Sequence, residues 1–187
     1  MLMSGVLRRT LLRLAAAGRL RPGWSERIGT EWRRNAARVW GTDPRVLDEE
    51  WRRMQGDFPQ AMLAPGSGHE TGLRYSDPKD WHVIGAACAA RDADGGAGAL
   101  ILTWNLKDFS RSELRRMAVS VQDPDRYLSR LWASDPPGVR LALAGIAADA
   151  ASWGHRPEPL AETLGRERLF RLRRLVEGAS SGRGAGA

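Results

Sequence analysis

Two short polar clusters lie at opposite ends of one apolar stretch, residues 77–109. Asp77 and Asp80 stand at its start, and Asn105 and Asp108 stand near its end. Converging carboxylates repel one another unless a cation lies among them, and oxygen ligands without thiolates or paired histidines favour Mg²⁺ or Mn²⁺ over zinc. Water bound to such an ion can attack a phosphodiester. We therefore ask whether the two clusters form one metal-dependent hydrolytic site.

The elements between the clusters predict that they meet. Asp77-Pro78 begins a helix that is expected to run to about Ala90, and "DADGGAG" at 92–98 breaks it. The apolar run "ALILTW" at 99–104 then suits a strand buried on both faces of a parallel sheet. In such sheets, helices begin near the carboxyl ends of the strands, where ligands bind. Both clusters should therefore lie at the same sheet edge.

Each of these residues also has a purely structural interpretation. Asp77, followed by Pro78, makes a good helix N-cap, and Asp80 and Asp108 could serve in caps as well. His82 is of a type that more often packs or forms hydrogen bonds than binds a metal. Cys88 lies on the apolar side of an alanine-rich helix and is expected to be a packing residue.

The rest of the chain predicts an α/β domain. Helices are expected at residues 4–18, 26–41, 43–58, 77–90 and 110–117, from Asp123-Pro124 onward, and around 137–152, 157–165 and 167–177. Strands are expected at 60–65, 99–104 and 118–122, a loop at 66–72, and a disordered tail at 178–187. This order predicts a three-layer α/β fold, a parallel sheet flanked by helices, with a helical C-terminal extension.

Composition narrows the setting of the protein. The chain has 187 residues and a net charge of +7, and lysine occurs only at 79 and 107, so 29 − 2 = 27 of its basic residues are arginine. That bias fits either genomic composition or a polyanionic partner, and charge alone does not separate them. A single cysteine suits a reducing cytoplasm. No apolar run has the length of a membrane span, and no signal peptide is expected.

Two motifs resemble the second half of a PIN domain, the fold of metal-dependent ribonucleases that include the toxin half of many bacterial toxin–antitoxin pairs. "DPKDWHVIGAACAA" matches an Asp-x-x-Asp-x-His-Val start with an alanine-rich helix, and "ALILTWNLKDF" matches a strand ending in Thr-x-Asn-x-x-Asp-Phe. "WSERIGTEWRRN" resembles the second helix of the subgroup. The resemblance covers roughly residues 3–135, so we expect a PIN-like domain at 1–135, the helical extension at 136–177 and the tail at 178–187.

The resemblance also implies roles for individual residues. It makes Glu31, Asp80 and Asp108 the expected ligands of Mg²⁺ or Mn²⁺, with Asp77 as a weaker candidate, and it gives Thr103 and Asn105 hydrogen bonds to the site or to the scissile phosphate. The implied reaction is hydrolysis of RNA, with an antitoxin protein and a second copy of the chain as further expected partners and no membrane.

The arginine-rich second helix offers contacts to RNA. Arg33, Arg34 and Arg38 are candidates for holding the RNA backbone, and Trp32 or Trp40 for stacking on a base, with core packing as the alternative for both tryptophans.

One part of the PIN pattern is missing. PIN domains begin with a central strand ending in a metal-binding Asp, whereas "MLMSGVLRR" resembles the segment immediately after that Asp, and no acidic residue precedes Glu26. Either the true start lies upstream, which we favour because the other motifs are present, or the chain is an inactive remnant. In both cases the 187-residue chain is expected to bind metal poorly and to be unstable, because neighbouring strands lose a ladder partner. The alternatives to a ribonuclease are a catalytically dead RNA- or protein-binding module and, more weakly, an assembly protein.

Overall fold

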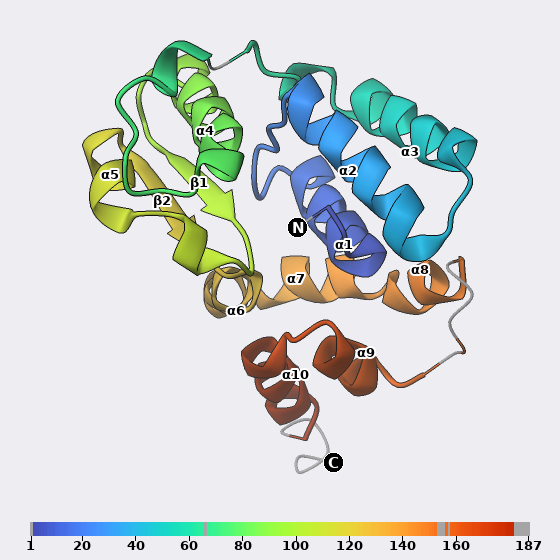
Figure 1. The fold of residues 1–187 in the computed structure, drawn as a ribbon. Helices are drawn as coiled ribbons and strands as arrows, with labels where there is room; N and C mark the ends of the chain where they lie inside the picture. The colour runs from blue at the N-terminus through green and yellow to red at the C-terminus, as the bar shows by residue number, and fades with distance from the viewer. Residues whose placement is uncertain (1, 66, 153–155, 157, 182–187) are drawn as a thin grey trace. The chain divides into compact units, whose positions relative to one another are not determined.

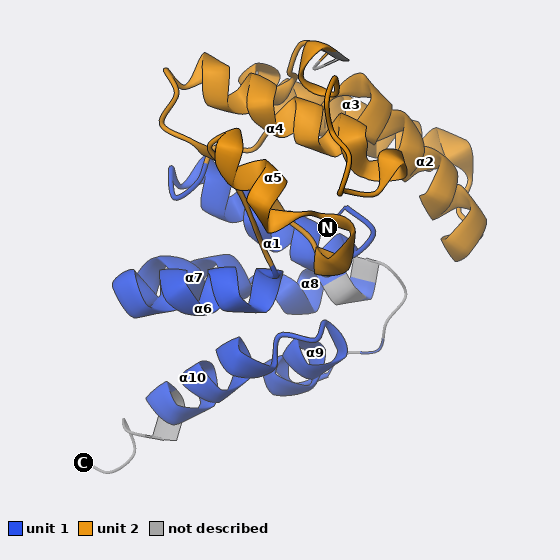
Figure 2. Ribbon diagram, turned by 60° about the vertical axis from the view of Figure 1, so that its left-hand side comes forward, with its two compact units in different colours: residues 1–20, 123–187 blue, residues 21–122 orange. Residues whose placement is uncertain are grey.

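The computed structural model describes residues 2–65, 67–152, 156 and 158–181, and the chain divides into two compact units. One unit comprises residues 21–122, and the other joins residues 1–20 to residues 123–187 (Figure 2). The boundary at residue 135 that the sequence predicted is not one of these divisions. The N-terminal helix α1 (Gly5–Ala16) packs against the helices α7 (Pro136–Leu143) and α8 (Ile146–Ser152), so it belongs with the C-terminal helices.

The unit formed by residues 21–122 begins with two helices that pack together through tryptophans. Helix α2 (Glu26–Trp40) is capped by Ser25, and helix α3 (Pro44–Asp57) is capped by Asp43, as the sequence predicted. Trp51 of α3 lies between Trp24 and Trp32, with ring centroids 5.8 and 6.2 Å away. Residue 29 must be glycine here, because a Cβ atom would lie 2.2 Å from the Trp51 ring.

The second part of this unit is a small parallel sheet with a helix on each strand. Strand β1 (Ala99–Leu102) pairs with β2 (Val119–Gln122) in register Ala99↔Val119, and α5 (Arg111–Arg116) connects them. Helix α4 (Trp81–Ala93) packs against β1, and α5 packs against β2 (Figure 1). The described chain is thus mostly helical, with an α/β-like core around a two-stranded parallel sheet.

This sheet has an apolar core that includes Cys88. Its buried side chains come from both helices, both strands and the preceding loops: Leu73, Ile84, Cys88, Ile101, Phe109, Leu114 and Val119. Cys88 is fully buried, as expected of a packing residue, and burial raises the pKa of its thiol. The prediction that the first strand is buried on both faces is wrong, since in β1 Ile101 is buried whereas its three neighbours are half-buried.

Several predicted element boundaries are also corrected. Residues 60–65 do not form a regular strand: a 3₁₀ turn at Pro59–Ala61 precedes one isolated parallel bridge between Met62 and Trp24. Residues 137–152 do not form one helix, because the helix is interrupted between Leu143, the end of α7, and Ile146, the start of α8. The first part of the predicted tail, through Ser181, is helical, and residues 182–187 lie outside the described part of the chain.

The other unit is helical throughout its described elements, which are α1, α6 (Pro124–Ser134), α7, α8, α9 (Leu160–Arg166) and α10 (Phe170–Ser181). Helix α10 packs on α6 and is capped from it. The buried carboxylate of Asp125 accepts hydrogen bonds of 2.9–3.1 Å from the backbone N–H groups of Arg171 and Leu172. A charge on α6 thus satisfies the N-terminal donors of α10, where a helix favours an anion.

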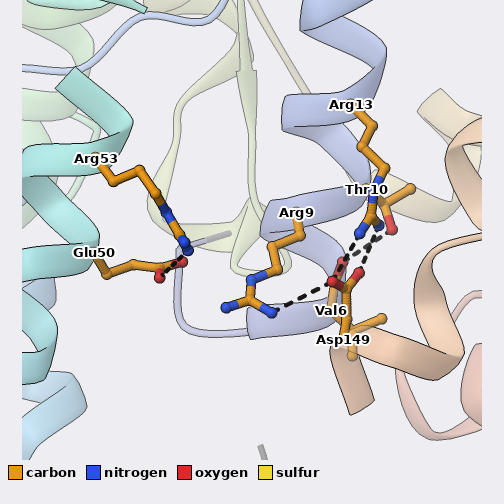
Figure 3. A network of polar contacts seen from close by, with 7 residues as sticks. All are labelled: Val6, Arg9, Thr10, Arg13, Glu50, Arg53 and Asp149. Carbon is orange, nitrogen blue, oxygen red and sulfur yellow. Dashed lines mark hydrogen bonds and ion pairs between the residues drawn. The ribbon is translucent and has the colours of Figure 1, made fainter. Parts of the chain in front are cut away.

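A second buried carboxylate joins α1 to α8. Figure 3 shows Arg9 and Arg13 pointing at Asp149, whose side chain is 4% exposed. Arg13 binds both carboxylate oxygens, at 2.6 and 2.8 Å, and Arg9 lies 3.4 Å from one of them. The hydrogen bond with Asp149 raises the pKa of Arg13 against the opposing effect of burial. The Arg13 guanidinium lies so close to Gly145 that a Cβ atom there would be 2.3 Å from Cζ.

Across residues 2–65, 67–152 and 158–181, none of the helices combines the length and the apolar character that crossing a bilayer requires.

Candidate carboxylate site

The first acidic cluster lies around a tight turn before α4. Asp77 caps a 3₁₀ turn at Pro78–Asp80, and its side chain accepts the backbone N–H of Lys79 at 2.9 Å. Asp80 directly precedes α4, and within residues 67–152 its side chain makes no capping hydrogen bond to that helix. The capping interpretation therefore holds for Asp77 and fails for Asp80, whose carboxylate is left for another role.

The two polar clusters meet, as the βαβ argument predicted. The backbone N–H of Asp77 donates to the carbonyl oxygen of Asp108 at 2.8 Å, although the two residues are 31 positions apart in the chain. The pKa of Asp80 is raised, first by burial and then by the negative charges of Asp108, Asp77 and Glu31, while His82 acts in the opposite direction. Acidic residues from three separate segments thus lie near enough to Asp80 to disfavour its negative charge.

The turn after β1 places Asp108. The side-chain amide of Asn105 donates a hydrogen bond to the Asp108 carboxylate. The Thr103 hydroxyl accepts the backbone N–H of Asn105 at 3.1 Å, and the backbone N–H of Thr103 donates to Gln122 of β2. Thr103 and Asn105 therefore hold the turn and its acidic side chain in place, while Asn105 itself stays exposed.

Glu31 joins the site from α2 through a buried histidine. Its carboxylate oxygen lies 3.0 Å from Nε2 of His82, whose side chain is only 3% exposed. Neither ring nitrogen of His82 makes an aligned hydrogen bond to the described groups, so this contact is an ion-pair distance without hydrogen-bond geometry. His82 is thus more than a packing residue: it carries a buried polar edge toward the acidic cluster.

The residue types of this cluster suit a divalent cation, but among the described residues the positions of their side chains do not yet form a binding site. Carboxylate oxygens gathered together suit Mg²⁺ or Mn²⁺ by ligand chemistry. Among the residues that the structure describes, however, no three His, Cys, Asp or Glu side chains are close enough to form a ready metal site. The residues fit such an ion by chemistry, and their side chains would have to converge further to bind it.

The predicted RNA contacts on α2 divide into two classes. Arg33 is already engaged, since it pairs with Glu26 at 2.8 Å and Asp48 at 3.4 Å and lies over the Trp51 ring. Arg34 and Arg38 are exposed and make no ion pair with any described residue.

Of the two interpretations of Trp32, stacking on a base and packing in the core, core packing is confirmed. Trp32 is 3% exposed and packs against Trp51, so it belongs to the core and offers no face to a base. Trp40 is half-buried and keeps part of its surface accessible.

Glu113 holds the loop that leads into this site, a role that the sequence did not predict. Its buried carboxylate accepts the backbone N–H groups of Arg74, Tyr75 and Ser76, the loop that leads into Asp77. Burial would raise the pKa of Glu113, but the hydrogen bonds from Arg74, the Ser76 hydroxyl, Tyr75 and the Ser76 N–H together lower it. The signal in the sequence was Ser-x-x-Glu at 110–113, a capping box pattern in which the glutamate would serve its own helix.

Relief of the carboxylate repulsion provides a test. Replacing Asp80 with asparagine should raise the melting temperature at pH 7 by roughly 1–4 °C, since relieving partly exposed like charges is worth up to about 1 kcal/mol. Because the pKa of Asp80 is higher in the folded than in the unfolded chain, its ionisation opposes folding. That cost is absent below the unfolded pKa, near 3.8, and complete above the folded pKa, so the gain should shrink as the pH falls toward 3.8.

The matched control for this measurement is Asp57→Asn, which removes an exposed carboxylate at the end of α3. It should leave the melting temperature within about 1 °C at every pH. A melting temperature of Asp80→Asn at or below that of the unchanged chain at pH 7 would show that the four carboxylates do not repel one another.

Comparison with known proteins adds no family to this geometry: the chain matches no protein-family model, no curated protein and no solved structure.

Proposed function

We propose that this chain is a metal-dependent ribonuclease of the PIN type, with a three-layer α/β domain, that hydrolyses RNA phosphodiesters at the carboxylates around Asp80. The observation that carries the proposal is that acidic residues from three segments come together: the Asp77 N–H donates to the Asp108 carbonyl at 2.8 Å, and Glu31 lies 3.0 Å from His82 beside Asp80. Burial and the charges of Asp108, Asp77 and Glu31 raise the pKa of Asp80 in agreement with this arrangement. Neighbouring carboxylates repel one another, and a bound cation would offset that repulsion. A cluster of acidic residues with a perturbed pKa is therefore a candidate metal site.

The residues of the site have different roles in this proposal. Glu31, Asp80 and Asp108 would hold Mg²⁺ or Mn²⁺, and Asp77 contributes less because its side chain already caps Lys79. The bound ion would supply an activated water and offset the charge on the leaving oxygen. Asn105 keeps the Asp108 carboxylate in place through its hydrogen bond.

The exposed basic groups near the site support a polyanionic substrate. Arg34 and Arg38 stand one helical turn or two beyond Glu31 on the same side of α2. Lys79 and Lys107, which are the two lysines of the chain, are exposed next to Asp80 and Asp108. These four cations lie close in the chain to Glu31, Asp80 and Asp108. Their positive charges would bind the phosphates on either side of a scissile bond.

The test is RNA cleavage by the 187-residue chain at a high concentration of Mn²⁺, because its metal binding is expected to be weak. Asp80→Asn and Asp108→Asn should each lower the cleavage rate by at least about 100-fold, because loss of even an outer partner of a metal site costs about 10–100-fold. Asp57→Asn should cleave at the rate of the unchanged chain. Cleavage that survives both site substitutions, or that persists in EDTA, would rule out this site as the nuclease centre.

The second candidate is an RNA-binding module without catalysis. The observation that favours it is the absence, among the described residues, of three side chains close enough to bind a metal ion. RNA binding without Mn²⁺-dependent cleavage in the same assay would select this candidate. An antitoxin protein and a second copy of the chain are proposed as partners on the resemblance to the PIN family alone.

A further inference from the structure

The loop 74–76 before the carboxylates is held rigidly by a residue far along the chain. Three successive backbone N–H groups, of Arg74, Tyr75 and Ser76, donate to the single carboxylate of Glu113, which is 6% exposed. Ionised carboxylates form stronger hydrogen bonds than neutral acceptors, and the lowered pKa of Glu113 keeps it ionised. The backbone of this loop is therefore fixed although it belongs to no helix or strand.

Further contacts fix the same loop from its other sides. The Ser76 hydroxyl accepts the backbone N–H of Ser110 at 3.0 Å, and the Ser76 carbonyl accepts the indole N–H of Trp81 at 2.9 Å. The next residue, Asp77, donates its backbone N–H to Asp108. The loop is thus connected to α4, to α5 and to the turn after β1, and two of these, α4 and the turn after β1, adjoin the carboxylates of the candidate site.

This fixed loop presents an aromatic side chain to solvent. Tyr75 is 72% exposed, although its own backbone N–H is held by Glu113 at 3.1 Å. Single exposed aromatic residues are common on protein surfaces. Tyr75 differs in lying two residues before Asp77, a chain distance of at most about 7 Å. Exposed cations stand on both sides of it in sequence, at Arg74 and Lys79.

We infer that Tyr75 is a stacking platform for one unpaired base of a single-stranded RNA whose neighbouring phosphates contact the cations beside it, Arg74 and Lys79. A base has to be unstacked from its own strand before it can lie on a protein ring, so such a platform selects single strands over duplexes. Because Glu113 already orders the backbone, little conformational entropy is lost when the base binds. Arg74 and Lys79 supply charges for the phosphates on either side. The identity of the strand as RNA rests on the proposed function.

The inference is tested by binding, in EDTA, of a fluorescently labelled single-stranded RNA oligonucleotide to the full chain, measured by anisotropy. Tyr75→Ala should weaken binding by about 5- to 100-fold, the range that loss of one base–aromatic stack produces. Tyr75→Phe keeps the ring and should bind within about threefold of the unchanged chain. Affinity for the corresponding RNA duplex should be unaffected by either substitution.

The matched control is Phe170→Ala, which removes another exposed aromatic ring, 55% accessible, from α10. It should leave single-strand affinity unchanged. Equal affinity of Tyr75→Ala and the unchanged chain, an equal loss for the duplex, or no measurable single-strand binding by the unchanged chain would each overturn the inference. Since no metal is present, a failure of Mn²⁺-dependent cleavage sinks the proposed function and leaves this result intact.

Discussion

Replacing Glu113 with glutamine should lower the free energy of unfolding by about 2–4 kcal/mol at neutral pH. The substitution keeps the size of the side chain but removes its negative charge. It also replaces one carboxylate oxygen, an acceptor, by an NH₂ group, which is itself a donor and cannot accept a backbone N–H. Three N–H groups now share that carboxylate. Hydrogen bonds to charged groups contribute about 1.5–3 kcal/mol each, and buried donors left without an acceptor add a desolvation cost.

The pH dependence of this effect has a definite sign. The pKa of Glu113 is lower in the folded chain than its ordinary value of 4.5, so its ionisation stabilises the fold. That contribution is complete above the unfolded pKa and is lost as the pH falls through the folded pKa. The difference between the unchanged chain and Glu113→Gln should therefore be constant from about pH 6 to 8 in denaturant titrations and shrink below about pH 4.5.

Glu49→Gln is the control for Glu113, since it removes an exposed glutamate that pairs with Arg52 on the surface of α3. Its effect should stay below about 0.5 kcal/mol. Hydrogen exchange at Arg74, Tyr75 and Ser76 should accelerate in Glu113→Gln and not in Glu49→Gln. Unchanged exchange at these three amides would contradict the role of Glu113 in holding the loop.

Replacing Arg13 with methionine should cost about 2–4 kcal/mol of unfolding free energy. Methionine keeps the apolar stem of the side chain but removes both hydrogen bonds that Arg13 makes to Asp149. The Asp149 side chain is 4% exposed, and of the two arginines beside it in Figure 3 only Arg9, at 3.4 Å, would remain. An uncompensated buried charge is the costly element of a broken ion pair. Arg13 is 36% exposed, so it can reach water once its partner is gone.

A double-mutant cycle separates the buried carboxylate from the arginine. Asp149→Leu should destabilise less than Arg13→Met, and the double variant should recover part of the loss of Arg13→Met, because the buried carboxylate that Arg13 compensates is then removed as well. Arg52→Met, on the exposed surface of α3, is the control for loss of an arginine. Additive effects in the cycle would show that Arg13 and Asp149 contribute independently.

Local features of the chain were predictable because their physical causes span a few residues. Asp43 and Asp77 each stand before a proline and accept the N–H group two residues on, and Ser25 caps α2. The parallel pairing of 99–102 with 119–122 followed from an apolar run, a short helix and a second run. The meeting of Asp77 with Asp108 followed in turn from that pairing.

Features that depend on distant partners were not predictable. The capping box pattern at Ser110 and Glu113 indicated a local hydrogen bond, yet the glutamate reaches a loop 37–39 residues away. Trp32 and Arg33 have the residue types of an RNA-binding helix, yet Trp51 and Asp48 of α3 engage them. The sequence carries no local trace of either partner, because any of several helices could have packed there.

The sequence by itself determined the caps of α2 and α3, the parallel pairing of residues 99–102 with 119–122, and the meeting of acidic residues from both ends of 77–109. These outcomes depend on backbone hydrogen bonds and apolar periodicity, which act over short chain distances. Only the tertiary structure decided that α1 joins the C-terminal helices, that Asp80 is left without a capping role, and that Glu113 holds the loop presenting Tyr75. Buried charges take whichever partners the packing of distant elements brings within hydrogen-bond reach, because leaving them unpaired costs more than any local preference.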